Sequence, residues 1–220
     1  MKALLILPFM MLAACASVQK PKPLTHQDHI KVVYEDAEKA FANKEYERAV
    51  KQFEEVRSKY PYSKYAALSD LRLGDVFFEQ ERWLEAADAY DFYLKFHPRH
   101  ENNAFAAFRI AKAYVNAKPK DFFLFPKSFL RDQSSTEDAL FAIDRFLSRY
   151  PEHESAKEAL AMKIKLRSEM AKRDLNIAEF YIKRKKLEGA KFRLKYVQET
   201  YSDTPEAELA LKKLEALSHS

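Results

Sequence analysis

The chain has 220 residues, of which only two are glycine; charged residues make up 32%, and the formal net charge is +5. Tight turns between strands favour glycine, so the composition argues against a β-rich fold, and the abundance of Ala, Leu, Lys, Glu and Arg favours helices. The charge is mild and its two signs are mixed, which indicates a solvated surface rather than a nucleic-acid footprint.

The N-terminal segment, residues 1–14, has the features of a lipoprotein signal peptide. Lys2 precedes the apolar run ALLILPFMMLAA, which is too short to span a bilayer and has the length of a signal-peptide core. The run ends in LAAC, which resembles the lipobox where bacterial lipoproteins are cut before a lipid-modified cysteine. Cys15 is the only cysteine in the sequence, so no disulfide competes for it. The alternative is an ordinary secretory signal with a buried cysteine.

The residues after Cys15 indicate a tether at the outer membrane. In the lipoproteins that the lipobox resembles, Asp after the modified cysteine is typical of retention in the inner membrane, whereas this chain has Ala16. The segment ASVQKPKPLTHQDH is polar, contains proline and lacks an apolar period. We therefore predict a flexible lipidated tether over residues 15–28.

A repeat begins after the tether. Four predicted helix ends look alike, namely RSKYPYS, LKFHPRH, LSRYPEH and QETYSDT, and 37 residues separate Pro61 from Pro98. An alanine and a large apolar residue precede each of these helix ends at fixed distances. The alanines are Ala49, Ala86, Ala139 and Ala190, and the large residues are Phe53, Tyr90, Ile143 and Leu194. Small residues recur further upstream at Ala37, Gly74, Ala111 and Ala178.

This pattern resembles the tetratricopeptide repeat, in which a small residue in the first helix lets the second helix approach closely. Two antiparallel amphipathic helices cannot bury their apolar stripes alone, so stacked pairs complete the core. We predict an all-α solenoid of about five helix pairs from about Gln27 to Leu217. N-terminal repeats would occupy residues 29–150, and a long linking helix with C-terminal repeats would occupy residues 151–220.

The third repeat is lengthened by an aromatic insertion over residues 117–135. This insertion contains DFFLFPKSFLRDQ, whose phenylalanines would make an apolar patch if they were exposed. We expect Phe122, Phe123 and Phe125 to fill a groove between the third repeat and the linking helix, since burying each ring is worth about 1.5–3 kcal/mol. The alternative is an exposed contact for a client or for membrane. Ser135 or Thr136 is predicted to cap the following helix.

The fourth repeat is lengthened differently. Its extra residues lie in ESAKEALAMKIKLRSEMAKRD, which has no helix breaker, so we predict a helix extended by about four turns. The last segment, PEAELALKKLEAL, opens with Pro205 at a position that suits a helix start. It is predicted to be a terminal helix that covers the end of the array.

Candidate catalytic motifs are weak. His97 and His100 flank a repeat terminator with only Glu101 beside them, and a metal site needs three or four ligands, so we interpret them as loop residues. The sequence contains no Gly-rich phosphate loop and no G-x-S-x-G motif. The basic run 183–186 falls at a predicted helix end, where the dipole favours cations. We therefore predict a scaffold without a cofactor, not an enzyme.

The order of these features is similar to the BamD (YfiO/ComL) family, tetratricopeptide lipoproteins of the outer-membrane β-barrel assembly machinery. The resemblance covers essentially all of the mature chain, from the lipobox through RSKYPYSKYA, the insertion ending in RDQSS and the linking helix to TYSDTPEAELAL. It implies a lipid-anchored periplasmic scaffold that docks a BamA-like barrel protein through its POTRA domain and helps receive unfolded outer-membrane proteins. Other lipoproteins of the complex are compatible partners.

The resemblance also implies roles for two residues. Arg193 matches the family's arginine on the second helix of the last full repeat, eight residues before Tyr201, which implies contact with the BamA-like protein. The alternative is an exposed arginine on a basic helix. Tyr60 matches the Tyr-Pro that closes the first repeat and is a candidate for substrate contact, with helix-end packing as the alternative.

A different class of function stays open for a tetratricopeptide lipoprotein of this kind. Such a protein can also act as a pilotin for a secretin or as another adaptor of the cell envelope. The aromatic insertion and the long linking helix favour the assembly family. Co-purification from membranes discriminates the two, because it would recover a BamA-like protein in one case and a secretin in the other.

Overall fold

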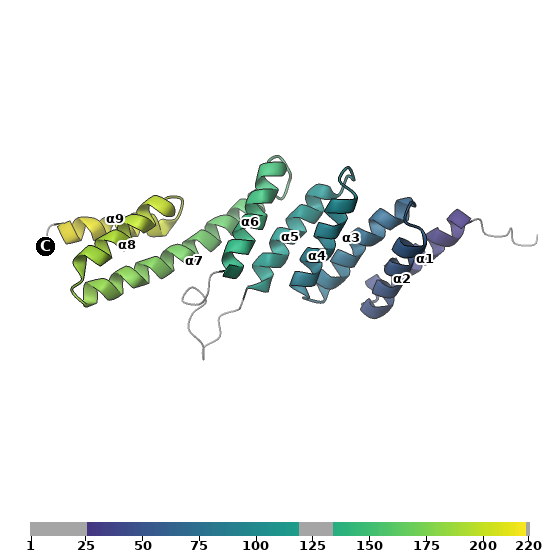
Figure 1. Cartoon of the computed structure of the whole chain (residues 1–220), viewed down its shortest axis with the longest axis horizontal. Coiled ribbons are helices and arrows are strands. Elements are labelled where there is room, and N and C mark those ends of the chain that lie inside the picture. Colours follow the sequence, from purple (N-terminus) through teal and green to yellow (C-terminus); the bar gives the residue numbers. More distant parts are fainter. Residues whose placement is uncertain (1–25, 119–133, 219–220) are drawn as a thin grey trace, which may run out of the picture.

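The computed structural model describes residues 26–118 and 134–218, and every regular element within these ranges is a helix. In chain order these ranges hold α1 (His26–Ala42), α2 (Tyr46–Lys59), α3 (Lys64–Glu79), α4 (Trp83–Phe96), α5 (Asn103–Ala117), α6 (Ser134–Arg149), α7 (Ala156–Lys183), α8 (Leu187–Thr200) and α9 (Pro205–Ser218). Each helix packs on the next, and Figure 1 shows one extended array. The prediction of an all-α tetratricopeptide-like solenoid is confirmed, with four helix pairs and a single terminal helix in the described residues.

The repeat register read from the sequence matches the packing. The four alanines and the four large residues of the second helices are all completely buried: Ala49, Ala86, Ala139, Ala190, Phe53, Tyr90, Ile143 and Leu194. The small residues of the first helices, Ala37, Ala111 and Ala178, are equally buried. In the pairs α1–α2, α5–α6 and α7–α8, the small residue of the first helix and the large residue of the second belong to the same hydrophobic core, which agrees with the resemblance.

Gly74 shows how close this approach is. A Cβ atom built on Gly74 would lie 2.6 Å from two ring atoms of Tyr90, which is far inside van der Waals contact. Tyr90 itself is fully buried between α3 and α5, so its ring has no free space into which to move. Glycine at this position is thus required by the helix–helix distance rather than by backbone conformation.

The first helices of the pairs make the contacts between repeats that skip a helix. We call α1, α3, α5 and α7 the A helices, and α2, α4, α6 and α8 the B helices. α1 packs on α3, α5 packs on α7 and α7 packs on α9, whereas the described B helices make no comparable contacts with one another. Contacts between successive repeats beyond the chain order are therefore made by A helices and α9.

The long helix α7 joins two hydrophobic cores. Its first half contributes Ala159 and Leu166 to the core of the second and third repeats, together with Phe108 and Phe146. Its second half contributes residues to a separate core with α8 and α9, which includes Leu175. The prediction of a lengthened helix is confirmed by the 28 residues of α7. The division of the chain into an N-terminal and a C-terminal group of repeats remains a prediction.

Several predicted boundaries can be compared with the structure. α1 begins at His26, inside the tether predicted over residues 15–28, and α9 begins at Pro205 as expected. α6 begins at Ser134, so Ser135 and Thr136 lie within its first turn, and the prediction that one of them caps the helix from outside is wrong. Helix hydrogen bonding there extends further toward the N-terminus than the polar pattern indicated.

The insertion predicted over residues 117–135 overlaps the last residue of α5 and the first two residues of α6, and residues 119–133 lie outside the described residues, so the insertion stays a prediction. Phe122, Phe123 and Phe125 lie outside the described residues, as do Cys15 and the signal segment, so these assignments stay predictions. At the end of α5, Lys118 donates a hydrogen bond from Nζ to Glu169 Oε2 at 2.6 Å, which ties α5 to α7. None of the described helices is both long and apolar enough to cross a membrane.

The contact between Gly74 and Tyr90 gives a stability test. We expect Gly74→Leu to lower the free energy of unfolding by about 1–3 kcal/mol or more, because the new side chain overlaps a ring that cannot move. A thermal or urea melt followed by circular dichroism measures the change.

Gly189 in α8 provides the matched control. Its added Cβ would lie 3.4 Å from the Tyr181 ring, which is ordinary contact, and alanine is the better helix former. Gly189→Ala should therefore melt no lower than the parent protein. An unchanged melting curve for Gly74→Leu would contradict the proposed register of α3 on α4.

Candidate interaction surfaces

Arg193 is held by a buried carboxylate of the neighbouring helix. Its Nη1 donates a hydrogen bond to Asp174 Oδ1 at 2.9 Å, which joins α8 to α7. The Asp174 side chain is only 7% exposed, whereas the Arg193 side chain is 36% exposed. Burial raises the pKa of Asp174, and the neighbouring Arg193 and Arg173 cations act in the opposite direction. The pair is not evident from the sequence, because Asp174 and Arg193 are 19 residues apart.

The pairing changes how Arg193 is understood. It is neither deeply buried nor the simply exposed arginine that the sequence analysis kept as the alternative. The carboxylate engages Nη1, while part of the arginine side chain remains accessible from outside. Because arginine has five N–H donors in a fixed fork, it can hold Asp174 and still offer donors to a carboxylate of another protein.

A second arginine also joins α7 to the C-terminal end of α8. Arg167 on α7 donates from Nε to both oxygens of Asp203 at 2.8 Å and from Nη2 to the Thr200 carbonyl at 2.6 Å. Its guanidinium also lies 5.5 Å from the centre of the Tyr201 ring. Hydrogen bonding to Arg167 lowers the pKa of Asp203. These contacts join the end of α8 and the α8–α9 turn to α7, and we call α7, α8 and α9 the C-terminal unit.

A ladder of ion pairs runs along the A helices of the first three repeats. Arg72 on α3 donates from Nε to Glu38 Oε1 on α1 at 2.8 Å and from Nη1 to Asp75 Oδ2 at 2.9 Å. Arg109 on α5 lies 3.7 Å from Asp75 Oδ1 through its Nη2. Arg72 and Arg109 each stand two residues before the small residue of their own repeat, which is Gly74 or Ala111. Their partners Glu38 and Asp75 each stand one residue after the small residue of the preceding repeat, which is Ala37 or Gly74.

This ladder is partly buried and connects to the core. Tyr90 donates its hydroxyl to Asp75 Oδ1 at 2.5 Å and accepts from Arg109 Nε at 3.1 Å. Burial raises the pKa of Tyr90 well above its ordinary value, so its hydroxyl stays protonated. Arg109 also stacks on Phe78, 3.6 Å from the ring centre. Arg72 and Glu38 are 34 residues apart, so residue spacing within one helix does not indicate such pairs between repeats.

An open groove lies at the N-terminal end of the array, between the start of α1 and the start of α3. It is lined by Asp28, Ile30, Lys31, Tyr62, Ser63, Lys64 and Tyr65. Tyr62 is fully exposed, whereas Tyr65 packs against Tyr34 with 5.1 Å between ring centres. The groove therefore combines a fixed aromatic wall, a free tyrosine and two lysines, which suits an extended segment with apolar and acidic groups.

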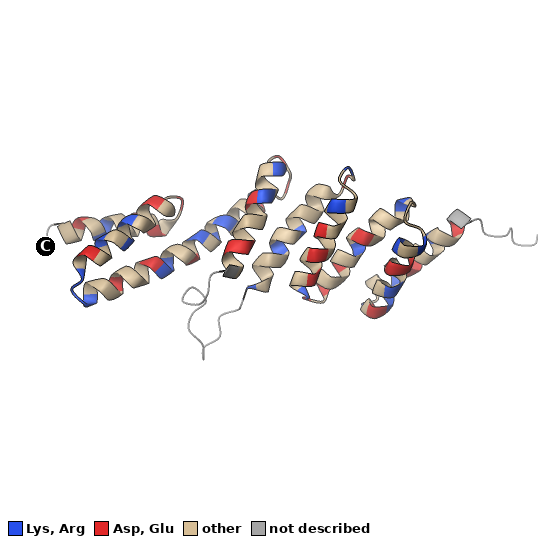
Figure 2. Cartoon of the chain, viewed as in Figure 1, with Lys and Arg blue, Asp and Glu red and all other residues tan. Residues whose placement is uncertain are grey.

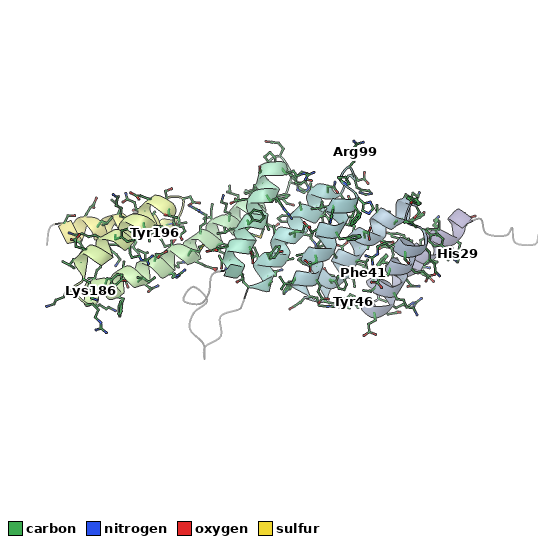
Figure 3. The ribbon with its side chains drawn as sticks, in the orientation of Figure 1. His29, Phe41, Tyr46, Arg99, Lys186 and Tyr196 are labelled. Atoms are coloured by element: carbon green, nitrogen blue, oxygen red, sulfur yellow. The ribbon has the colours of Figure 1, made fainter. Side chains whose placement is uncertain are left out.

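Tyr60 lies beside this groove but is not part of its lining. It ends α2, where its N–H donates to the Val56 carbonyl at 3.0 Å, and its ring meets His29 edge-on at 6.3 Å. Figure 3 shows His29 at the N-terminal end of the array. This position agrees with the helix-end packing that the sequence analysis gave as the alternative, and the substrate role of Tyr60 stays untested. Tyr62 and Tyr65, in the same YPYSKY stretch, are the tyrosines that line the groove.

His97 and His100 turn to different partners. His97 Nε2 lies 2.7 Å from Asp70 Oδ2, and His100 Nδ1 lies 2.7 Å from the Tyr93 hydroxyl. Asp70 is buried and also lies 3.6 Å from Arg57 Nη1, so it links the end of α2, α3 and the α4–α5 turn. Within the described residues, no group of three or more His, Cys, Asp or Glu side chains is placed to hold a metal ion.

Comparison with known proteins agrees with this architecture. The sequence profile of the family described as "YfiO: Outer membrane lipoprotein" matches residues 26–219. Among curated proteins, the outer membrane protein assembly factor BamD of Neisseria meningitidis serogroup B is 26% identical over 227 residues, covering 93% of this chain and 81% of the relative. BamD of Caulobacter vibrioides is 27% identical over 199 residues, covering 89% of this chain and 63% of the relative. BamD of Vibrio cholerae is 24% identical over 183 residues, covering 82% and 76%.

The family match spans the whole described array, from the first residue of α1 to the residue after α9. The resemblance stated from the sequence is therefore confirmed at the level of the family. The chain belongs to the YfiO family of outer membrane lipoproteins.

Proposed function

We propose that this protein is a non-catalytic scaffold of outer-membrane protein assembly, tethered by lipid to the outer membrane and facing the periplasm. The observation that carries the proposal is the extent of the family match, residues 26–219, which coincides with the helical array from His26 to Ser218. The relatives with this match are themselves outer membrane protein assembly factors. A stiff array of helix pairs supplies what a scaffold needs, since it holds separate contact surfaces at fixed spacing.

The C-terminal unit is the proposed docking site for a BamA-like barrel protein through a POTRA domain. Arg193 is held in place by Asp174 at 2.9 Å while its side chain remains 36% exposed. A guanidinium fixed in this way loses little side-chain entropy when it binds a carboxylate. The hydrogen bonds from Arg167 to Asp203 and to the Thr200 carbonyl hold the end of α8 on α7, so we expect the partner to meet a preformed site.

The N-terminal groove is the proposed site for segments of unfolded outer-membrane proteins. Its lining includes Tyr62 and Tyr65, which offer large aromatic faces with polar tips, and Lys31 and Lys64, which favour acidic groups or a chain terminus. The ion-pair ladder of α1, α3 and α5 keeps the neighbouring repeats in register. The groove and the C-terminal unit lie at opposite ends of the array, so one molecule can hold a client and a docking partner together (Figure 1).

The lipid anchor is tested at Cys15. We expect Cys15→Ala to leave the protein uncleaved or free of the membrane fraction, because no other thiol in the sequence can take the lipid. Membrane fractionation and mass spectrometry of the N-terminus measure this, with Ser17→Ala as the neighbouring control. An unmodified mature N-terminus at another residue would overturn the assignment.

The docking role of Arg193 needs a variant that keeps the fold intact. Removing Arg193 alone would leave the Asp174 carboxylate buried without a partner, and Arg193→Glu would place two carboxylates together. We therefore combine Arg193→Gln with Asp174→Asn, which preserves a neutral hydrogen-bonded pair. Binding to a POTRA fragment should weaken by about 2 kcal/mol or more, roughly 30-fold, with little change in the melting temperature.

Two controls separate docking from stability. Asp174→Asn alone keeps the arginine and should keep most of the binding. Lys195→Gln removes one cation from the same helix at a side chain that is 70% exposed, so it matches the loss of charge. Equal POTRA binding by the double variant and the parent protein would argue against Arg193 as the docking residue. If co-purification from membranes recovers a secretin and no BamA-like protein, the proposed function is wrong.

The client groove is tested at Tyr62. Because its side chain is fully exposed, Tyr62→Ala should leave the melting temperature unchanged. We expect the affinity for a peptide from the C-terminal strand of an outer-membrane protein to fall by about 1–2 kcal/mol, as for an aromatic contact residue in an interface. Leu84→Ala, at another exposed apolar residue, is the control. Fluorescence anisotropy of a labelled peptide measures both, and equal affinities would place the client elsewhere.

A further inference from the structure

The turn between α7 and α8 carries four consecutive cations, Lys183, Arg184, Lys185 and Lys186, and all four are exposed. Figure 2 shows the turn in blue, and Figure 3 shows Lys186 at its outer end. The flanking carboxylates along the chain are engaged elsewhere, since Glu179 pairs with Lys213 at 3.0 Å and Glu188 pairs with Lys191 at 3.3 Å. Within the described part of the chain, these four cations therefore have no anionic partner.

Equivalent turns of the same array show that the fold does not require this charge. Lys44, Glu81 and Lys185 occupy the same position in their A-to-B turns and share a left-handed backbone, with φ of 61°, 57° and 57°. The first turn reads NKEY and the second QERW, so each contains an acid, whereas the fourth reads RKKL. The same backbone turn thus forms with mixed charges twice and with uncompensated cations once.

Helix electrostatics also fail to account for these cations. Lys183 ends α7, where the dipole favours a cation, but Lys186 is the N-cap of α8, where a cation is unfavourable. The corresponding N-cap of α4 is Arg82, and Glu85 three residues later pairs with it. Three residues after Lys186 stands Gly189, which offers no charge. The helix-dipole interpretation from the sequence therefore covers only the first part of the run.

Apolar side chains accompany the cations at the turn. Phe180, one helical turn before Arg184, is 54% exposed, and Leu187, next to Lys186, is 38% exposed. Arg184 lies 5.3 Å from the centre of the Phe180 ring. Cations next to exposed aromatic and aliphatic groups are typical of protein surfaces that rest on anionic lipid headgroups, with the apolar groups entering the interface. A protruding turn also suits a flat, extended anionic surface.

We propose that the α7–α8 turn is a contact site for the surface of a bilayer that contains anionic phospholipid. The inference rests on the proposed tethering of the chain at a membrane. It adds a second, electrostatic point of contact far along the array from the N-terminal tether. With both points engaged, the array would lie along the membrane surface, which limits the orientations in which the C-terminal unit meets its docking partner.

The test measures binding of residues 16–220, which keep every described helix, to vesicles of phosphatidylcholine with and without phosphatidylglycerol. Because Cys15 is absent, the result is independent of lipidation, and a failure here leaves the Cys15 experiment to decide the tether separately. We expect binding only to the vesicles with phosphatidylglycerol, and we expect it to weaken as salt increases. Lys185→Gly should reduce the partition coefficient about fivefold, the effect of one cation near an anionic surface.

The matched control is Lys44→Gly, which makes the same substitution at the same left-handed position in another turn. Glycine favours this backbone, so both variants should melt at or above the temperature of the parent protein. Only Lys185→Gly should lose vesicle binding. Equal loss in both variants, or no loss in either, would overturn the proposal. Unchanged vesicle binding together with weaker POTRA binding would also overturn it and make the turn a protein contact.

Discussion

The array depends on a close approach between the two helices of each pair, where a small residue of one meets a large residue of the other. Gly74 is the extreme case, since a Cβ there would lie 2.6 Å from Tyr90 ring atoms, and buried alanines play the same part in the other repeats. Close approach lets each large side chain contact both its partner helix and the next repeat. Each such burial is worth about 1.5–3 kcal/mol, and the stack needs many of them because no single pair has a complete core.

The same closeness makes the polar ladder possible. Only because α4 lies tightly on α3 does the Tyr90 hydroxyl reach Asp75 at 2.5 Å, where Arg72 and Arg109 also converge. Asp75 is nearly inaccessible, so its charge is costly unless all of these partners are in place. A shift of one repeat against the next would leave the carboxylate without its donors, so we infer that the ladder favours the observed register.

The proposed contact surfaces use side chains that contribute little to the packing of the helices. Tyr62 is fully exposed, and within the described residues the cations of the α7–α8 turn have no anionic partner, so neither feature is needed to hold the helices together. Arg193 is intermediate, because Asp174 uses one of its donors for the fold and its exposed part remains available. The long helix α7 belongs to both neighbouring cores and therefore fixes the distance between the N-terminal groove and the C-terminal unit.

The local pattern of the sequence determined the helices, the repeat register and the family, because each depends on residue spacing along one or two helices. The buried Ala49 and Ala190, the start of α9 at Pro205 and the 28 residues of α7 follow from such spacing. Tertiary structure alone decided which charges meet. Asp174 and Arg193 are 19 residues apart, and Glu38 and Arg72 are 34 residues apart. These helices carry many cations, and only the packing of the helices determines which cation meets each carboxylate. It also decided that Tyr62 and Tyr65, rather than Tyr60, line the groove, because a shift of a few residues at a helix end turns a side chain from one face to another.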